Sequence, residues 1–92
     1  MIVRIMGEGQ VQVDDSHLAE LNAHDTELLH AVESGDEAAF RRTLGALLDA
    51  VRGFGEPLAE DALAPSQLIL PSPDATLEEV REMLNDDGLI PG

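Results

Sequence analysis

The sequence predicts an α+β fold, in which an N-terminal β-hairpin packs against a pair of antiparallel helices and a C-terminal helix. Three observations lead to this prediction. Apolar and polar residues alternate at the start of the chain, apolar residues recur at helical spacing over its middle, and a second helical pattern follows a proline-rich stretch. With 92 residues, the chain is expected to form a single domain over 1–92.

The first predicted element is the hairpin, which is expected to bend at Gly7-Glu8-Gly9. A three-residue loop there would pair Ile5 with Val11 and Val3 with Val13, so that all four β-branched side chains share one face. Gly9 would then occupy the left-handed position that such loops favour. The opposite face is predicted to carry the remaining side chains: Arg4, Met6, Gln10 and Gln12.

Two helices joined by a short turn are predicted next. The first covers about 16–33, with a break left open near 23–25, where Asp25 falls on the apolar stripe and could cap a second segment. Gly35 is expected to end this helix in a left-handed conformation, and Asp36 to cap the next one. The second helix has the clearest apolar stripe in the chain: Phe40, Leu44, Leu47, Leu48, Val51 and Phe54.

The last third combines a proline-rich stretch with a final helix. Residues 56–75 hold four of the five prolines, and 68–70 within them is compatible with a short third strand. Three residues are too few to decide between a strand and a loop. Thr76 and Glu79 form a capping box that opens a third helix, and Gly88 followed by Leu89 predicts where it closes.

The charge balance narrows the classes of partner. Nineteen acidic residues against five basic ones, all arginine, give a net charge of −14. Direct binding to nucleic acid or to an anionic membrane surface is therefore not expected, because both depend on cationic side chains. The acidity fits a solubility role, a salty cytoplasm, a GC-rich genome or pairing with a basic protein face, and composition leaves these open.

The same composition favours a cytoplasmic location. The chain has no cysteine, which fits a reducing compartment. No signal peptide is recognisable, and the apolar runs fall far short of the roughly 20 residues that a spanning helix needs. Direct insertion into a membrane is therefore not expected.

No pattern in the sequence predicts catalysis, a cofactor or a metal site. The histidines at 17, 24 and 30 lack the spacing that places two imidazoles on adjacent turns of one helix face. Acidic pairs are too common in this chain to indicate a catalytic pair. Gly7 and Gly9 are explained by a hairpin turn, since no helix or lysine follows them as in a phosphate-binding loop. We therefore expect a protein that is not an enzyme.

Two groups of surface residues remain as candidates for binding a partner. One is the polar face of the hairpin, formed by Arg4, Met6, Gln10 and Gln12, whose alternative is a merely solvated sheet face. The other is the arginine cluster on the outer side of the second helix, formed by Arg41, Arg42 and Arg52, whose alternative is to neutralise an acidic surface. Arg41 and Arg42 are its candidate binding residues.

Four segments resemble the PspA-associated domain family, PspAA. They are MIVRIMGEGQVQVDD at the start, AVESGDEAAF at the helix link, LAPSQLILPSPDATLEEVREML in the last third and GLIPG at the end. The resemblance spans the whole chain. It implies a small cytoplasmic protein encoded beside phage-shock protein A (PspA), a coiled-coil, membrane-remodelling protein of the envelope-stress response. It transfers no catalytic or binding residue.

Three functions follow as expectations. The first is a non-catalytic adaptor or modulator of PspA, which could be recruited to the inner face of the membrane by that partner. The second is an acidic regulator that occupies the basic surface of a transcription factor. The third is a small ligand-binding domain, which a pocket with convergent polar groups would favour. The sequence leaves the oligomeric state open.

Overall fold

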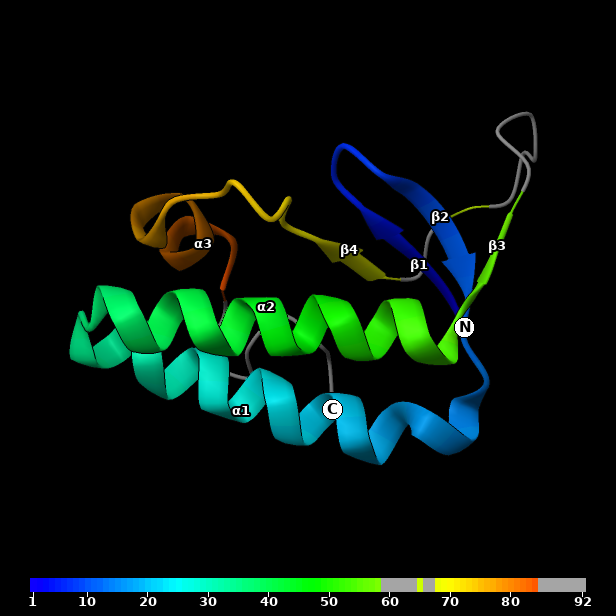
Figure 1. Ribbon diagram of the computed structural model, residues 1–92, viewed down its shortest axis with the longest axis horizontal. Coiled ribbons are helices and arrows are strands. Elements are labelled where there is room, and N and C mark those ends of the chain that lie inside the picture. The colour runs from blue at the N-terminus through cyan, green and yellow to red at the C-terminus, as the bar shows by residue number, and fades with distance from the viewer. Residues whose placement is uncertain (59–64, 66–67, 85–92) are drawn as a thin grey trace.

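The computed structural model describes residues 1–58, 65 and 68–84, and it confirms the α+β fold (Figure 1). A sheet covers one end of a helix pair, and a third helix lies over the other end, where α1 turns into α2. The strands are β1 (Ile2–Ile5), β2 (Gly9–Gln12), β3 (Glu56–Pro57) and β4 (Leu68–Leu70). The helices are η1 (Asp15–His17, a 3-10 turn), α1 (Leu18–Ser34), α2 (Glu37–Phe54) and α3 (Leu77–Met83).

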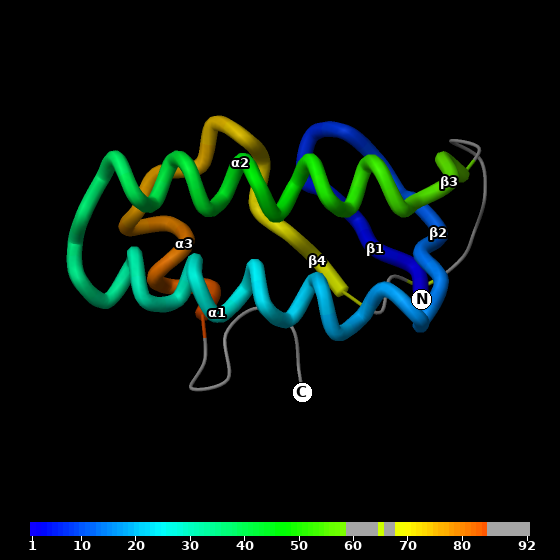
Figure 2. Tube along the Cα trace, turned by 60° about the horizontal axis from the view of Figure 1, so that its bottom comes forward, coloured from blue at the N-terminus to red at the C-terminus, as the bar shows by residue number. Residues whose placement is uncertain are grey.

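The sheet has four strands in the order β3-β2-β1-β4. The short third strand that 68–70 allowed is present as β4, and it runs parallel to β1 with Val3 opposite Leu68. The antiparallel strand β3 was not predicted, because its two residues include a proline, which cannot donate a backbone hydrogen bond. In Figure 2, β1 and β4 cross the helix pair obliquely.

The hairpin register differs from the prediction by two residues. Val3 faces Val11 and Ile5 faces Gly9, so the predicted pairs of Ile5 with Val11 and of Val3 with Val13 are wrong. The connecting turn contains residues 6–8, so Met6 lies in it and not in the strand. Gly7 and Gly9 have φ values of +85° and +115°, which favour glycine. A shift of two keeps every side chain on its predicted face, so the alternation pattern could not detect it.

The helix pair follows the predicted signals. Gly35 ends α1 with a φ of +71°, and the Asp36 carboxylate caps α2 by accepting a hydrogen bond from the Ala39 N–H at 3.1 Å. The break that was left open near 23–25 does not occur, because α1 is continuous there. Asp25 instead lies inside the helix and is 3% exposed.

The third helix opens at the predicted capping box, in which Thr76 accepts a hydrogen bond from the Glu79 N–H. It ends at Met83, and Leu84 is extended. The predicted closure at Gly88 and Leu89 lies outside the described residues.

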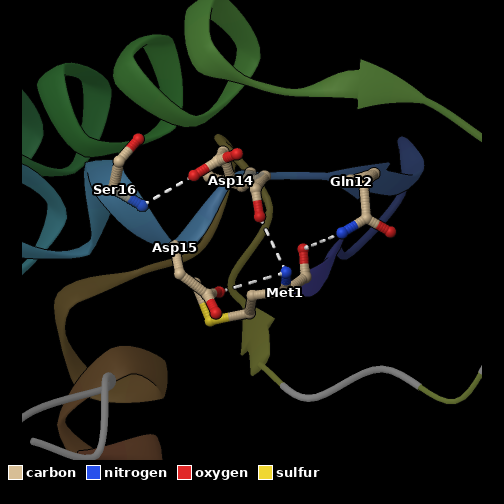
Figure 3. Close-up of polar contacts among 6 residues, drawn as sticks. Met1, Gln12, Asp14, Asp15 and Ser16 are labelled. Carbon is tan, nitrogen blue, oxygen red and sulfur yellow. Dashed lines mark hydrogen bonds and ion pairs between the residues drawn. The ribbon is translucent and has the colours of Figure 1, made fainter.

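Polar contacts hold the start of β1 to the end of β2 (Figure 3). The Met1 amino group donates a hydrogen bond to the Val13 carbonyl at 2.7 Å and lies 3.4 Å from the Asp15 carboxylate. The Asp14 carboxylate accepts a hydrogen bond from the Ser16 N–H at 2.8 Å, and this bond is the main cause that lowers the pKa of Asp14. The link between β2 and η1 is therefore held in place by hydrogen bonds.

The core lies between the sheet and the helix pair. The inner face of the sheet contributes Val3, Ile5, Val13, Leu68 and Leu70, and these pack with the apolar stripes of α1, α2 and α3. The predicted stripe of α2 is buried except for Phe54, which is half-buried. Because β-strand side chains alternate, the other face of the sheet is left to residues that the core does not use.

Candidate functional site

The outer face of the sheet carries the first group of candidate residues. We define the outer sheet face by its strand residues that point away from the core: Ile2, Arg4, Gln10, Gln12, Glu56 and Ile69. Arg4 lies at its centre, with Gln10 beside it on β2 and Ile69 beside it on β4. In Figure 1 the helix pair covers the opposite side of the sheet, so none of the described helices lies over this face.

Exposed apolar side chains lie next to Arg4. Ile69 is 49% exposed, and so is Met6, whose N–H donates a hydrogen bond to the Leu70 carbonyl at 3.0 Å. The described residues contain one further exposed large apolar side chain, Met83, on α3. A mixed apolar and cationic surface is thus concentrated around the turn of the hairpin.

A cavity of about 460 Å³ opens beside this surface. Its apolar side chains are Ile5 on β1, Val11 on β2, Pro57 on β3 and Leu58, which follows β3. Its polar side chains are Arg4, Glu8, Gln10 and Arg52, and Gly9 and Gly55 complete the lining. The volume is within the range of small-molecule pockets. This cavity was not predicted from the sequence, because Gly9 was expected in the loop of the hairpin and its place opposite Ile5 follows only from the register.

An ion pair at the cavity connects the hairpin turn to α2. The Arg52 guanidinium donates two hydrogen bonds to the Glu8 carboxylate, one of them from Nε to Oε1 at 2.9 Å. It also donates to Asp49 at 2.8 Å. The hydrogen bonds from Arg52 lower the pKa of Glu8 below its ordinary value, more than the small desolvation raises it. Arg52 is therefore neutralised within the molecule.

The ion pair with Arg52 predicts how the contribution of Glu8 to the free energy of unfolding depends on pH. A lowered pKa in the folded state means that the contribution is complete above the ordinary value of 4.5 and is lost as the pH falls through the lower folded pKa. The free energy of unfolding of Glu8→Gln should therefore be lower than that of the unmodified protein at pH 7. This difference should shrink at pH 3. Urea unfolding at both pH values measures it. Glu20→Gln, an exposed acid without an ion pair among the described residues, is the control. A Glu8→Gln difference that does not change with pH would contradict the assignment.

Arg41 and Arg42, the candidate residues on α2, have different surroundings. Arg41 donates hydrogen bonds to the backbone carbonyls of Ala75 at 2.9 Å and Pro73 at 3.4 Å, and it lies 5.3 Å from the centre of the Phe40 ring. It thus fastens the segment before α3 onto α2. Arg42 is exposed and makes no hydrogen bond or ion pair with the part of the chain that the structure describes.

Arg42 lines a separate groove of about 580 Å³ between α1 and α2. The other lining residues from the two helices are Glu27, His30, Ala31, Ser34, Ala39 and Thr43. Arg42 therefore does not lie with Arg4, and the structure does not bring the two candidate groups together into one site.

The histidines do not gather around a common point. His17 stacks on the Phe54 ring with a centroid distance of 4.1 Å, at the open end of the helix pair. Within residues 1–58, 65 and 68–84, no three acidic, histidine or cysteine side chains could hold a metal ion together. None of the helices in these ranges is long and apolar enough to cross a membrane.

The family model described as PspA-Associated protein, PspAA, matches residues 1–92. The chain belongs to the PspAA family. This confirms the resemblance of the four segments quoted above, and the name of the family indicates an association with PspA. No curated protein and no solved structure matches this PspAA chain.

Proposed function

We propose that this PspAA protein is a non-catalytic interaction module that binds PspA in the cytoplasm and modulates its assembly. The observation that carries the proposal is the family match over the whole chain, because the family is named for its association with PspA. The protein would then reach the inner face of the membrane only through its partner.

Features of the surface support a binding role. The outer sheet face, together with Met6, combines exposed apolar side chains with a cation and amides, which is the mixture found in protein interfaces. Arg42 is exposed as well, but it lies on the helix pair, away from this face, and is not part of the proposed binding surface. Arg41 supports the proposal less well, because its guanidinium already binds two carbonyls of the same chain.

Co-purification tests the proposal directly. PspA should be retained by the immobilised protein, and the size distribution of PspA assemblies should change when the protein is added in excess, as measured by light scattering after gel filtration. An unrelated domain of similar size and net charge is the control for acidity alone. No retention, together with unchanged PspA assemblies at excess, would refute the proposal.

The net charge of −14 favours one alternative, an acidic regulator that covers the basic surface of a transcription factor. Competition between this protein and DNA for a regulator, measured by fluorescence anisotropy, separates it from PspA binding. Release of the DNA without any effect on PspA would favour the alternative.

A further inference from the structure

Open space next to a glycine forms part of the cavity beside Arg4. Gly9 occupies an inner-face position of β2, opposite Ile5, and a β-carbon at Gly9 would have no heavy atom within 4 Å among its neighbours. Val11, which is half-buried, and Ile5, which is almost completely buried, also line the cavity at this edge of the sheet. Leu58, whose N–H donates to the Gln10 carbonyl at 3.0 Å, adds a further apolar side chain.

The two arginines at this cavity differ in whether an acidic residue of the same chain compensates their charge. Arg52 is balanced by Glu8 and Asp49. Arg4 is exposed and forms no hydrogen bond or ion pair with residues in the described ranges. The chain carries 19 acidic residues, yet none of those described pairs with Arg4. Its guanidinium is therefore available to a carboxylate of another molecule.

We propose that the cavity lined by Ile5, Val11 and Leu58 accepts an apolar side chain of the partner, and that Arg4 at the cavity pairs with a neighbouring acidic residue of the same partner segment. The inference rests on the proposed function and assigns that function a docking point on the protein. Apolar anchors in pockets and arginines are the groups that most often dominate interface energies.

The groove at Arg42 is a weaker candidate for this role. Its apolar lining consists of two alanines, Ala31 and Ala39, so it offers little apolar surface to a partner side chain. It also contains a carboxylate of its own, Glu27, on the opposite helix. Arg42 therefore provides a matched control, because it is an exposed arginine on a different surface and has no hydrogen-bond or ion-pair partner among the described residues.

The test compares Arg4→Glu with Arg42→Glu, using purified PspA as the probe and calorimetry or biolayer interferometry as the readout. The two substitutions change the net charge equally, and both sites are exposed. We expect Arg4→Glu to weaken PspA binding about tenfold or more, whereas Arg42→Glu stays within about twofold of the unmodified protein. Arg4→Lys should retain part of the affinity.

A second variant tests the apolar part of the site. Leu58→Ser should weaken PspA binding while urea unfolding shows that the variant is folded at the assay temperature. Full affinity of both Arg4→Glu and Leu58→Ser, or equal losses for Arg4→Glu and Arg42→Glu, would overturn the assignment of the site while PspA binding itself stands. Failure of the unmodified protein to bind PspA would instead refute the proposed function.

Discussion

Replacing Phe40 with alanine is expected to lower the free energy of unfolding by about 3–5 kcal/mol. Phe40 is fully buried in the first turns of α2, and it is the largest side chain in the core. Its removal takes apolar area out of the core and leaves a cavity that the neighbouring leucines can fill only in part. In a domain whose total stability is on the order of 5–15 kcal/mol, this loss is a large fraction. Urea unfolding followed by circular dichroism measures it.

The other phenylalanine of the chain serves as the control. Phe54 is half-buried at the end of α2, where it stacks on His17. Phe54→Ala should therefore cost clearly less than Phe40→Ala, because less apolar area leaves the interior. Equal losses for the two substitutions would contradict the packing described for α2.

Replacing Gly55 with alanine should lower the free energy of unfolding by about 1–3 kcal/mol, the usual cost of overpacking. A β-carbon at this position would lie 2.8 Å from the Val51 carbonyl oxygen and 2.9 Å from the Val11 β-carbon. Neither neighbour can move freely, because Val51 is in α2 and Val11 is in the centre of the sheet. In a domain of this size, each kcal/mol corresponds to about 4–8 °C in Tm, so differential scanning calorimetry can measure the change.

Gly53 is the matched control two residues earlier. It lies within α2, and a β-carbon there would meet nothing within 4 Å. Alanine favours a helix over glycine by about 0.5–1 kcal/mol, so Gly53→Ala should leave the protein as stable or make it more stable. Loss of stability in Gly53→Ala comparable to that in Gly55→Ala would show that the close approach of α2 to β2 is not the cause.

The helices could be predicted from the sequence because their signals are local. The Asp36 cap, the left-handed Gly35 and the capping box at Thr76 each depend on residues within one or two turns. The continuity of α1 through Asp25 could not be predicted, because a buried carboxylate within an apolar stripe is tolerated only through tertiary surroundings that the local pattern does not contain.

The pairing of the strands could be predicted from the sequence only in part. Alternation specifies the face of each strand residue but allows shifts by two, so the conformations of Gly7 and Gly9 decided the register. Strand β3 has no sequence pattern of its own and depends on the exposed edge of β2. The polar face with Arg4 was predicted, whereas the cavity beside it needed the register, the end of α2 and β3 together.

The parallel pairing of β1 with β4 has a consequence for how the protein folds. The hairpin and the helix pair are each formed by segments that are close together in the sequence. Val3, by contrast, can pair with Leu68 only after the intervening chain has closed into a long loop. The entropy of this closure must be lost before β4 contributes any stabilisation, so β4 is expected to join after the other elements have formed. The outer sheet face next to Ile69 is then completed last, and its availability to a partner is tied to the last step of folding.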